Sequence, residues 1–317
     1  MRRAWLATAV LFAATALVAG CAGPPHLDPV SVTAADGRGA IRPLPAPTGC
    51  TVTATDSDSL TAAMSSAAPG QRICVFGTIG TTRLILRQSG TEDRRIEVVG
   101  DGHTIVRGIT VEASNVTVDG INSVHGWAPG ISLTGDNIIL RNSTSIAPRG
   151  DDRDGLRYFG SNLQIVHNTF RDTLNLDLAH ADCMQNYATG PDSPASQHVT
   201  ITDNRCERIE NQCLIAEGPN SSAGDGSGEG ESSDLLFRNN YCDSHASQAV
   251  QLDDIQRATF ERNEIAAAQP KAFSFQNQST EGVVAEDNQL NPDIGYEVGM
   301  DDSSRPGYRG PEPGGQP

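Results

Sequence analysis

Aromatic residues and positive charge are both scarce in this sequence. Aromatic side chains make up only 5% of its 317 residues, and 23 Lys and Arg are set against 39 Asp and Glu, for a formal net charge of −16. Such an acidic chain repels polyanions unless a cation bridges them, so we expect no nucleic-acid partner. The chain also lacks a phosphate-binding loop, a zinc signature and a serine elbow, which leaves three common kinds of catalytic site without support.

Long apolar runs are missing too, apart from one at the N-terminus. It covers residues 4–19, after Arg2 and Arg3 and directly before small residues and Cys21. This order resembles a bacterial lipoprotein signal peptide, and sixteen residues are short for a membrane-spanning anchor. The resemblance implies export, removal of residues 1–20 and acylation of Cys21, with the protein anchored to the outer face of the bacterial cell membrane. Residues 21–49 contain six prolines and little periodicity, so they are predicted to be a tether.

A short phrase of alternating apolar and polar residues, ending in an asparagine and one more apolar residue, recurs along the chain. Its asparagine falls at positions 168, 204, 240, 263 and 288, in steps of 36, 36, 23 and 25 residues. The two long steps contain additional loops at residues 188–197 and 217–233. A second short strand follows most copies, so one repeat consists of two or three short strands. Such a unit buries its apolar side only by stacking on its neighbours.

This repeat resembles the right-handed parallel β-helix of the pectate-lyase-like superfamily, over residues 50–299. The resemblance implies an all-β solenoid in which each strand pairs with its copy in the next coil. It also implies that the five asparagines form a ladder of stacked, hydrogen-bonded amides. The tail at residues 300–317 is rich in proline and glycine and is predicted to be disordered.

The start of this β-helix is predicted to be closed by an α-helix within residues 58–68. Asp58 can cap it, and its apolar residues share one face, which would cover the open end of the core. These residues are Leu60, Ala63, Met64 and Ala67. Pro69 and Gly70 end the helix before a strand at residues 72–76.

Six cysteines follow Cys21, and four of them occupy matching slots of successive repeats. Cys206 and Cys242 each lie two residues after a ladder asparagine, and Cys183 and Cys213 share a slot before the second strand. Stacked positions lie within the Cα separation that a disulfide accepts, and export favours oxidation. We therefore predict the disulfides Cys50–Cys74, Cys183–Cys213 and Cys206–Cys242; an interior ladder of free thiols is the alternative.

A β-helix has a packed interior, so a functional site must lie on the outward face of its strands. Aligning the second strands of the repeats places polar residues in three columns. The first contains Asp154, Asp182, Gln212, Gln248 and Lys271; the second Arg157, Gln185, Ile215, Gln251 and Ser274; the third Phe159, Tyr187, Glu217, Asp253 and Gln276. The same repeats carry the inserted loops, and insertions on one flank of a solenoid usually border its binding face.

The densest group is His180-x-Asp182-x-x-Gln185, a pattern that resembles one found in secreted bacterial β-helix proteins. His180 could act as acid or base tuned by Asp182, and Gln185 could bind a sugar hydroxyl or carboxylate. Arg157 could clamp a carboxylate or, if desolvated, act as a base. Lys271 is an alternative base. The alternatives are a hydrogen-bonded turn for the first group and a solvated side chain for Lys271.

Acidic residues near these columns could bind Ca²⁺, which prefers several oxygen ligands. Asp151, Asp152 and Asp154 precede Arg157 and are expected beside Asp182, while Glu217 and Asp253 stack on adjacent repeats. The Gly150-Asp-Asp sequence is similar to a polygalacturonase motif, but the other signatures of those hydrolases are missing. A solvated acidic loop is the alternative.

These observations predict a monomeric surface protein that acts on a polysaccharide, as a lyase cleaving uronate-containing glycans by β-elimination. A cation, or Arg157 and Gln185, would neutralise the uronate carboxylate. His180, oriented by Asp182, would remove the proton at C5, and Lys271 or Tyr187 would protonate the leaving oxygen. Asp154, Tyr187 and Gln251 are expected to contact the substrate. Two alternatives stay open: a glycoside hydrolase that uses Asp154 with Asp182 or Glu217 with Asp253, and a non-catalytic glycan-binding or partner-binding module.

Overall fold

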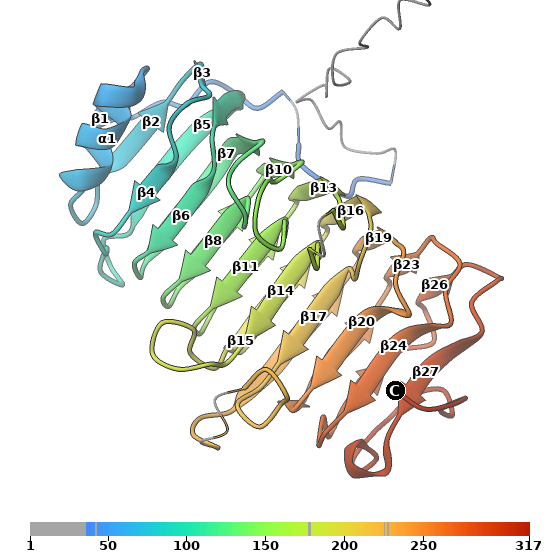
Figure 1. The fold of residues 1–317 in the computed structure, drawn as a ribbon. Helices are drawn as coiled ribbons and strands as arrows, with labels where there is room; N and C mark the ends of the chain where they lie inside the picture. The colour runs from blue at the N-terminus through green and yellow to red at the C-terminus, as the bar shows by residue number, and fades with distance from the viewer. Residues whose placement is uncertain (1–35, 42, 177–178, 225, 227) are drawn as a thin grey trace, which may run out of the picture.

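The chain forms a right-handed parallel β-helix made of two sheets (Figure 1). The computed structural model describes residues 36–41, 43–176, 179–224, 226 and 228–317. Every strand pairing between the named strands is parallel, and each strand pairs with its copy in the next coil. The predicted fold class is therefore confirmed.

Nine strands form the front sheet, which faces the viewer in Figure 1. In chain order they are β4 (Leu84–Leu86), β6 (Ile109–Glu112), β8 (Ile131–Thr134), β11 (Leu156–Phe159), β14 (Met184–Tyr187), β17 (Leu214–Glu217), β20 (Gln248–Asp253), β24 (Lys271–Gln276) and β27 (Tyr296–Met300).

Eighteen strands form the rear sheet, which the chain bends into two ladders. They are β1 (Val52–Ala54), β2 (Arg72–Val75), β3 (Thr78–Ile79), β5 (Ile96–Val106), β7 (Val116–Val124), β9 (Ile138–Arg141), β10 (Thr144–Ile146), β12 (Gln164–Val166), β13 (Thr169–Thr173), β15 (Gln197–Thr202), β16 (Arg205–Ile209), β18 (Ser232–Arg238), β19 (Tyr241–Ser244), β21 (Ile255–Gln256), β22 (Thr259–Glu261), β23 (Glu264–Ile265), β25 (Val283–Val284) and β26 (Gln289–Leu290). The bend between the ladders, which we call the rear corner, lies opposite the front sheet.

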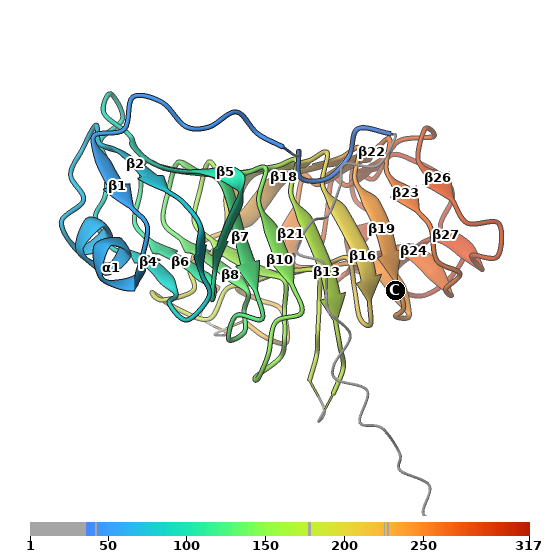
Figure 2. The same ribbon diagram turned by 90° about the horizontal axis from the view of Figure 1, so that it is seen from above.

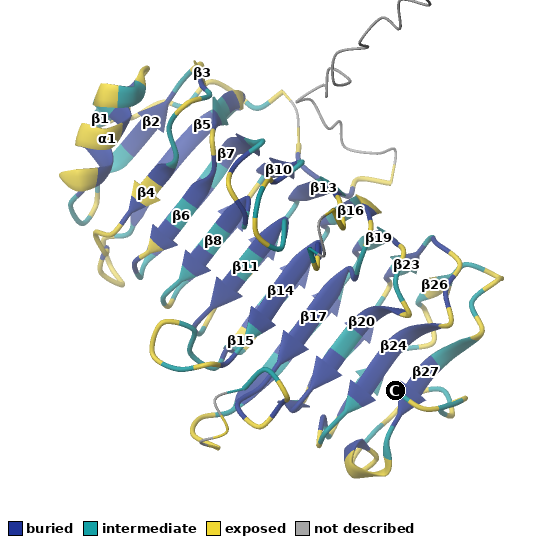
Figure 3. Ribbon diagram, in the orientation of Figure 1, coloured by how far each residue is buried: buried dark blue, intermediate teal, exposed yellow. Residues whose placement is uncertain are grey.

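Strand alternation decides which residues enter the core. In β11, Leu156 and Tyr158 are buried in the interior, while Arg157 between them points outward. Near the C-terminal end of the core the rings of Phe260 and Phe273 pack with their centroids 5.1 Å apart. Figure 3 shows this division, with strands mostly buried and exposed residues concentrated in the loops. Among the described residues, no helix has the length and apolar character needed to cross a membrane.

The asparagine ladder at the rear corner is confirmed. Each buried side-chain amide donates to the Oδ1 of the asparagine in the next coil, at 3.1 Å from Asn168 to Asn204 and 3.0 Å from Asn263 to Asn288. Each also donates to a backbone carbonyl, as Asn168 does to Leu140 at 3.0 Å. The asparagines thereby satisfy buried backbone groups at a bend where no strand can do so.

The capping helix α1 (Ser57–Ser65) covers the start of the core, as predicted. Its N-cap is Asp56 rather than Asp58: the Asp56 carboxylate accepts from the Ser59 amide at 2.8 Å, and the Ser59 hydroxyl accepts from the Asp56 amide. This reciprocal capping box satisfies two free amides of the first turn, whereas Asp58 lies within that turn. Leu60 and Met64 are buried against the first coils.

Both predicted unstructured segments need correction, the tether only over residues 36–41 and 43–49, since residues 21–35 and 42 lie outside the described residues. In the expected tether, Arg38 and Ala40 are buried at the rear corner, where Ala40 donates to Thr169 Oγ1 at 2.9 Å. Figure 2 shows this segment running back along the body to β1. The C-terminal tail contains the 3-10 helix η1 (Asp302–Ser304), and the Met300 amide donates to Gly315 at 3.0 Å. A composition rich in proline and glycine predicts disorder, but here these residues turn the chain back onto the last coil.

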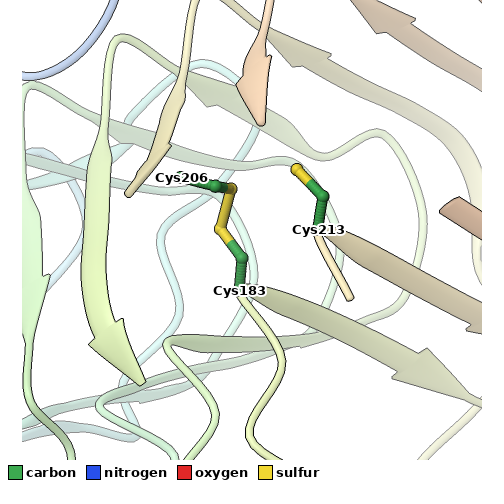
Figure 4. A group of neighbouring side chains, drawn as sticks. All are labelled: Cys183, Cys206 and Cys213. Carbon is green, nitrogen blue, oxygen red and sulfur yellow. A yellow bond between two sulfur atoms is a disulfide. The ribbon is translucent and has the colours of Figure 1, made fainter. Parts of the chain in front are cut away.

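The disulfide Cys50–Cys74 is confirmed, whereas the other two predicted pairs are wrong. The structure joins Cys183 to Cys206 and Cys213 to Cys242, and Figure 4 shows the first bond beside Cys213. The predicted stacking itself is correct, since Cys206 and Cys242 are register partners. Stacked side chains run parallel and keep the spacing of the coils, but side chains from opposite sides of the core point toward each other. Bonds across the core therefore meet the short Cβ separation that a disulfide needs.

Candidate active site on the front sheet

The three polar columns lie on the outer face of the front sheet, as predicted. In the second column Arg157 pairs with Gln185, Gln185 with Ile215, and Ile215 with Gln251. In the third column Tyr187 pairs with Glu217, and Glu217 with Asp253.

Loops border this face at both ends of its strands (Figure 1). The connections at residues 125–130, 147–155 and 174–183 lead into the front strands, and we call this the starting end. The inserted loops at residues 188–196 and 218–231 follow the strands at the finishing end.

His180 and Asp182 form an acid–imidazole pair at the starting end of β14. The His180 Nδ1 lies 3.1 Å from Asp182 Oδ2, with the histidine side chain 52% exposed and the aspartate fully buried. Asp182 Oδ1 accepts from Asn211 Nδ2 at 2.8 Å and from the Gln212 amide at 2.9 Å. The carboxylate is therefore fixed in place, and its contact with the imidazole raises the pKa of His180. This geometry suits proton transfer at an exposed imidazole.

Asp154 and Arg157 continue this network in the preceding coil. Asp154 Oδ1 accepts from the Asp182 amide at 2.9 Å, and its Oδ2 accepts from Arg157 Nε at 2.6 Å. Burial raises the pKa of Asp154 to about 7 although the Arg157 charge opposes the shift. For Arg157, burial is outweighed by the attraction of Asp154 and its other partners, which raises the pKa of the guanidinium.

Neither role predicted for Arg157 fits this arrangement. A guanidinium with a raised pKa cannot act as a base. Its fork is also occupied, because Nη2 donates to Asp152 Oδ2 at 2.9 Å while Nε binds Asp154. Arg157 instead positions the acidic residues of the site. This role follows from the charges that surround Arg157 and cannot be predicted from its place in the sequence.

Tyr187 and Gln185 lie beside Arg157 on the outer face. The Arg157 Cζ is 5.7 Å from the centroid of the Tyr187 ring, which packs edge-on against Phe159 at 5.0 Å. Gln185 is 8% exposed, and within the described residues its Oε1 has no hydrogen-bond partner. A buried amide oxygen without a partner is costly, so a ligand hydroxyl at this position would be favoured.

Glu217 and Asp253 stack at the finishing end of their strands. Burial, followed by the charges of Asp253 and Asp182, raises the pKa of Glu217 to about 7. Asp253 Oδ2 accepts from Gln276 Nε2 at 2.9 Å. Glu217 is therefore a carboxyl group that gains and loses its proton near neutral pH.

The residues predicted to bind Ca²⁺ do not gather into one site, and Asp154 and Asp182 already accept hydrogen bonds from Arg157 and Asn211. Asp151 and Asp152 lie on the starting-end loop beside Arg157, whereas Glu217 and Asp253 lie at the other end of the strands. Over the described ranges, one group of three or more His, Cys, Asp or Glu side chains has its ligand atoms within 4.8 Å of one another, and it consists of core cysteines. The donor set therefore does not fit Ca²⁺.

Lys271 and Gln251 lie too far along the sheet to join the His180 pair. Lys271 belongs to the first column, but three coil steps separate it from Asp182, roughly 14 Å at the usual strand spacing. Burial lowers the pKa of Lys271. Gln251 Oε1 accepts from Gln248 Nε2 at 2.6 Å two coils beyond Gln185. The columns were predicted correctly, but a shared column does not mean a shared site.

Asn211 belongs to the site but is not among the residues predicted from the sequence. It holds Asp182 from the next coil, and its position directly before Gln212 of the first column was the available signal. Cys21 and residues 1–20 lie outside the described residues, so the signal peptide and the lipid anchor remain predictions. A hollow of about 560 Å³, lined in part by Arg257 and Arg309, lies on the rear sheet and does not involve the His180 pair.

Comparisons with known proteins relate the chain to no sequence family. No protein-family model matches it, and no curated protein matches its sequence. Among solved structures, it is similar to an alginate lyase from Paenibacillus, with a TM-score of 0.47 and 16% identity over 79% of this chain and 98% of that one. It is also similar to a polysaccharide lyase from Pseudopedobacter saltans (TM-score 0.49, 15% identity, 76% of this chain and 65% of that one). A surface adhesin of Streptococcus pneumoniae is similar as well, with a TM-score of 0.40 and 10% identity over 77% of this chain and 88% of that one. Likenesses of this degree do not bear on activity, which has to be argued from the site.

Proposed function

We propose that the protein is a polysaccharide lyase that cleaves uronate-containing glycans by β-elimination on the front sheet. The observation that carries this proposal is the His180–Asp182 pair, in which a buried carboxylate, held by hydrogen bonds from Asn211 and the Gln212 amide, lies 3.1 Å from an exposed imidazole. Abstraction of a carbon-bound proton requires a base of this kind next to a group that stabilises the resulting negative charge.

In the proposed reaction neutral His180 takes the C5 proton of a uronate residue. The electron pair forms the C4–C5 double bond, the bond from C4 to the bridging oxygen breaks, and that oxygen takes a proton. Of the two donors predicted from the sequence, Tyr187 lies in the same coil as His180 and Lys271 lies three coils away. We therefore assign the proton donor to Tyr187.

The uronate carboxylate needs partners other than Arg157, whose fork is already held by Asp152 and Asp154. Gln185 has a side-chain amide to donate, and Glu217 in the next coil carries a proton below about pH 7. A protonated carboxyl group that donates to the substrate carboxylate neutralises it without a metal ion, which makes the C5 proton more acidic. This assignment also limits the negative charge that an anionic polymer meets on this face.

The proposal is tested by incubating the protein with alginate, polygalacturonate and a uronate-containing glycosaminoglycan. Unsaturated ends should appear as new ultraviolet absorbance at the same rate with Ca²⁺ and with a chelator, since the predicted calcium ligands do not converge. His180→Ala should lower kcat/KM by roughly a hundredfold or more. His198→Ala is the matched control, because His198 is also exposed and lies 3.7 Å from an aspartate, but on the rear sheet. Cleavage that survives His180→Ala, or no unsaturated ends on any polymer, would overturn the proposal.

A glycoside hydrolase is the second candidate, and one observation favours it. Glu217, with a pKa of about 7, stacks directly beside Asp253, and such enzymes use two neighbouring carboxyl groups. A hydrolase would release reducing ends without unsaturated products in the same incubations. A non-catalytic module would bind glycan and release neither.

A further inference from the structure

Exposed apolar side chains gather around the front sheet. In the described part of the chain five large apolar residues are exposed, and Trp127 is the most exposed of them at 68%. Trp127, Leu174 and Leu176 lie on loops at the starting end, and Ile85 lies on the outer face of β4. Only Ile41, in the N-terminal segment, lies elsewhere. The apolar surface therefore borders the same face as the proposed active site.

The backbone around Trp127 is held firmly. Arg83 Nη1 donates to the Trp127 carbonyl at 2.8 Å, and Trp127 forms a parallel bridge with Arg149 in the next coil. The Ala128 amide donates to the Arg149 carbonyl at 2.9 Å. A loop with these bonds presents the indole in one place, so binding to it would cost little ordering of the chain.

Gly150 provides the surface against which the indole lies. A Cβ atom at Gly150 would come within 2.5 Å of the Trp127 ring, so only glycine leaves room for this contact. Gly150 also has a φ of +72°, which other residues rarely adopt. The ring thus packs against a bare backbone and leaves most of its surface open.

Trp127 lies within reach of a glycan bound at His180. Its loop leads into β8, two coil steps before β14, which is roughly 10 Å at the usual strand spacing. Gly150 lies two residues before Asp152, which binds Arg157 of the site. On the other side of Trp127, a hollow of about 280 Å³ lined in part by Arg83 and Ile85 lies between the first coils and α1. A chain lying along the solenoid axis would pass His180, Trp127 and this hollow in turn.

We propose that Trp127 is a binding subsite that stacks on a pyranose ring of the glycan, on the α1 side of the His180 pair. One face of a pyranose carries C–H groups and its rim carries hydroxyls, so it matches a rigid aromatic surface at the edge of a polar site. The proposal rests on the proposed function for the identity of the chain, since a uronate polymer bound at His180 would extend across Trp127.

Fluorescence offers a direct test, because the sequence contains only two tryptophans, Trp5 and Trp127. In the Trp5→Phe chain all indole emission comes from Trp127. Titration with oligosaccharides of the cleaved polymer, with His180→Ala added to prevent turnover, should shift or quench that emission in a saturable manner. Binding of the oligosaccharide, measured by calorimetry, without any change in emission would overturn the proposal.

Kinetics provides the second readout. Trp127→Ala should raise KM roughly five- to tenfold and leave kcat nearly unchanged, because the ring contacts the polymer away from the reacting bond. Trp127→Phe should recover most of the loss, and Ile41→Ala, which removes an exposed apolar side chain at the rear corner, should have no effect. An unchanged KM in Trp127→Ala would refute the subsite while leaving the lyase proposal intact; absence of cleavage by the unaltered chain would refute the lyase instead.

Discussion

At the scale of single residues, burial and neighbouring charge decide the chemistry of the front sheet. Asp154 and Glu217 are both shifted to a pKa of about 7, mainly because they are buried. His180 is shifted upward by its contact with Asp182. Two carboxyl groups of the network therefore titrate near neutrality beside an imidazole whose pKa is raised, a feature that active sites share with buried structural networks.

These shifts predict a bell-shaped pH dependence of kcat/KM. His180 must be neutral to act as a base, so activity should rise as pH increases through its raised pKa. Glu217 must be protonated to pair with the substrate carboxylate, so activity should fall as pH increases through about 7. Glu217→Gln keeps an uncharged donor at every pH, and should therefore remove the alkaline limb while the acid limb remains.

The control for this prediction is Glu112→Gln, which changes a carboxylate paired with Arg87 near the α1 end of the same sheet. It should leave both limbs in place. If the alkaline limb persists in Glu217→Gln, the proton belongs to another group, and Asp154 is the one with a matching pKa.

At the scale of elements, the coil register decides which residues stack on one another, and the direction of the side chains decides which of them form bonds. The register brings Cys206 beside Cys242, yet each bond joins a cysteine directly before a front strand to a cysteine in a rear strand. In the same way, the register aligns Lys271 with Asp182 but leaves three coil steps between them. Neighbours in a column are thus related by stacking, while bonding and catalysis depend on which atoms approach each other.

The disulfide connectivity can be checked by tryptic mapping without reduction. Cleavage after Arg171, Arg205, Arg208, Arg238 and Arg257 places each of the four core cysteines on a separate peptide. The peptide of residues 172–205 should be linked to 206–208, and that of 209–238 to 239–257. Links between 172–205 and 209–238 would show instead that the bonds follow the stacking direction, and the full set of unlinked peptides would indicate free thiols.

At the scale of the whole molecule, the N-terminal segment ties together successive coils at the rear corner. Arg38 forms ion pairs with Asp36 and Glu264 and donates to the Asn240 carbonyl at 3.2 Å. Its guanidinium also lies near the Tyr241 ring, which Arg205 covers at 3.8 Å. Because this contact lies at the rear corner, an N-terminal anchor attached through it would leave the front sheet unobstructed.

This docking predicts that Arg38→Ala lowers the free energy of unfolding by about 1–3 kcal/mol, because two carboxylates and the Asn240 carbonyl lose the largely buried cation that pairs with them. Denaturant unfolding followed by circular dichroism measures the change. Arg87→Ala is the matched control: its pair with Glu112 is exposed and should contribute less than about 1 kcal/mol. Equal losses in the two variants would show that the segment adds no specific stability.

The amino-acid sequence by itself determined the coil architecture of this protein. The spacing of Asn168, Asn204 and Asn240 predicts the ladder, and the alternation in strands such as β11 predicts which side chains face the core and which form the outer columns. These features depend on the residue spacing of the repeat and on local hydrogen bonding, and short stretches of sequence determine both.

Only the tertiary structure decided which residues contact each other. Several features depend on contacts between segments that the sequence repeat does not relate. They are the disulfide partner of Cys183, the acidic partners of Arg157, the separation of Lys271 from the His180 pair and the docking of Arg38. Whether a polar residue reacts, binds or merely holds its neighbour is set by the atoms within a few ångströms of it. Those atoms come from other coils and from the loops, whose paths are determined only when the whole chain has packed.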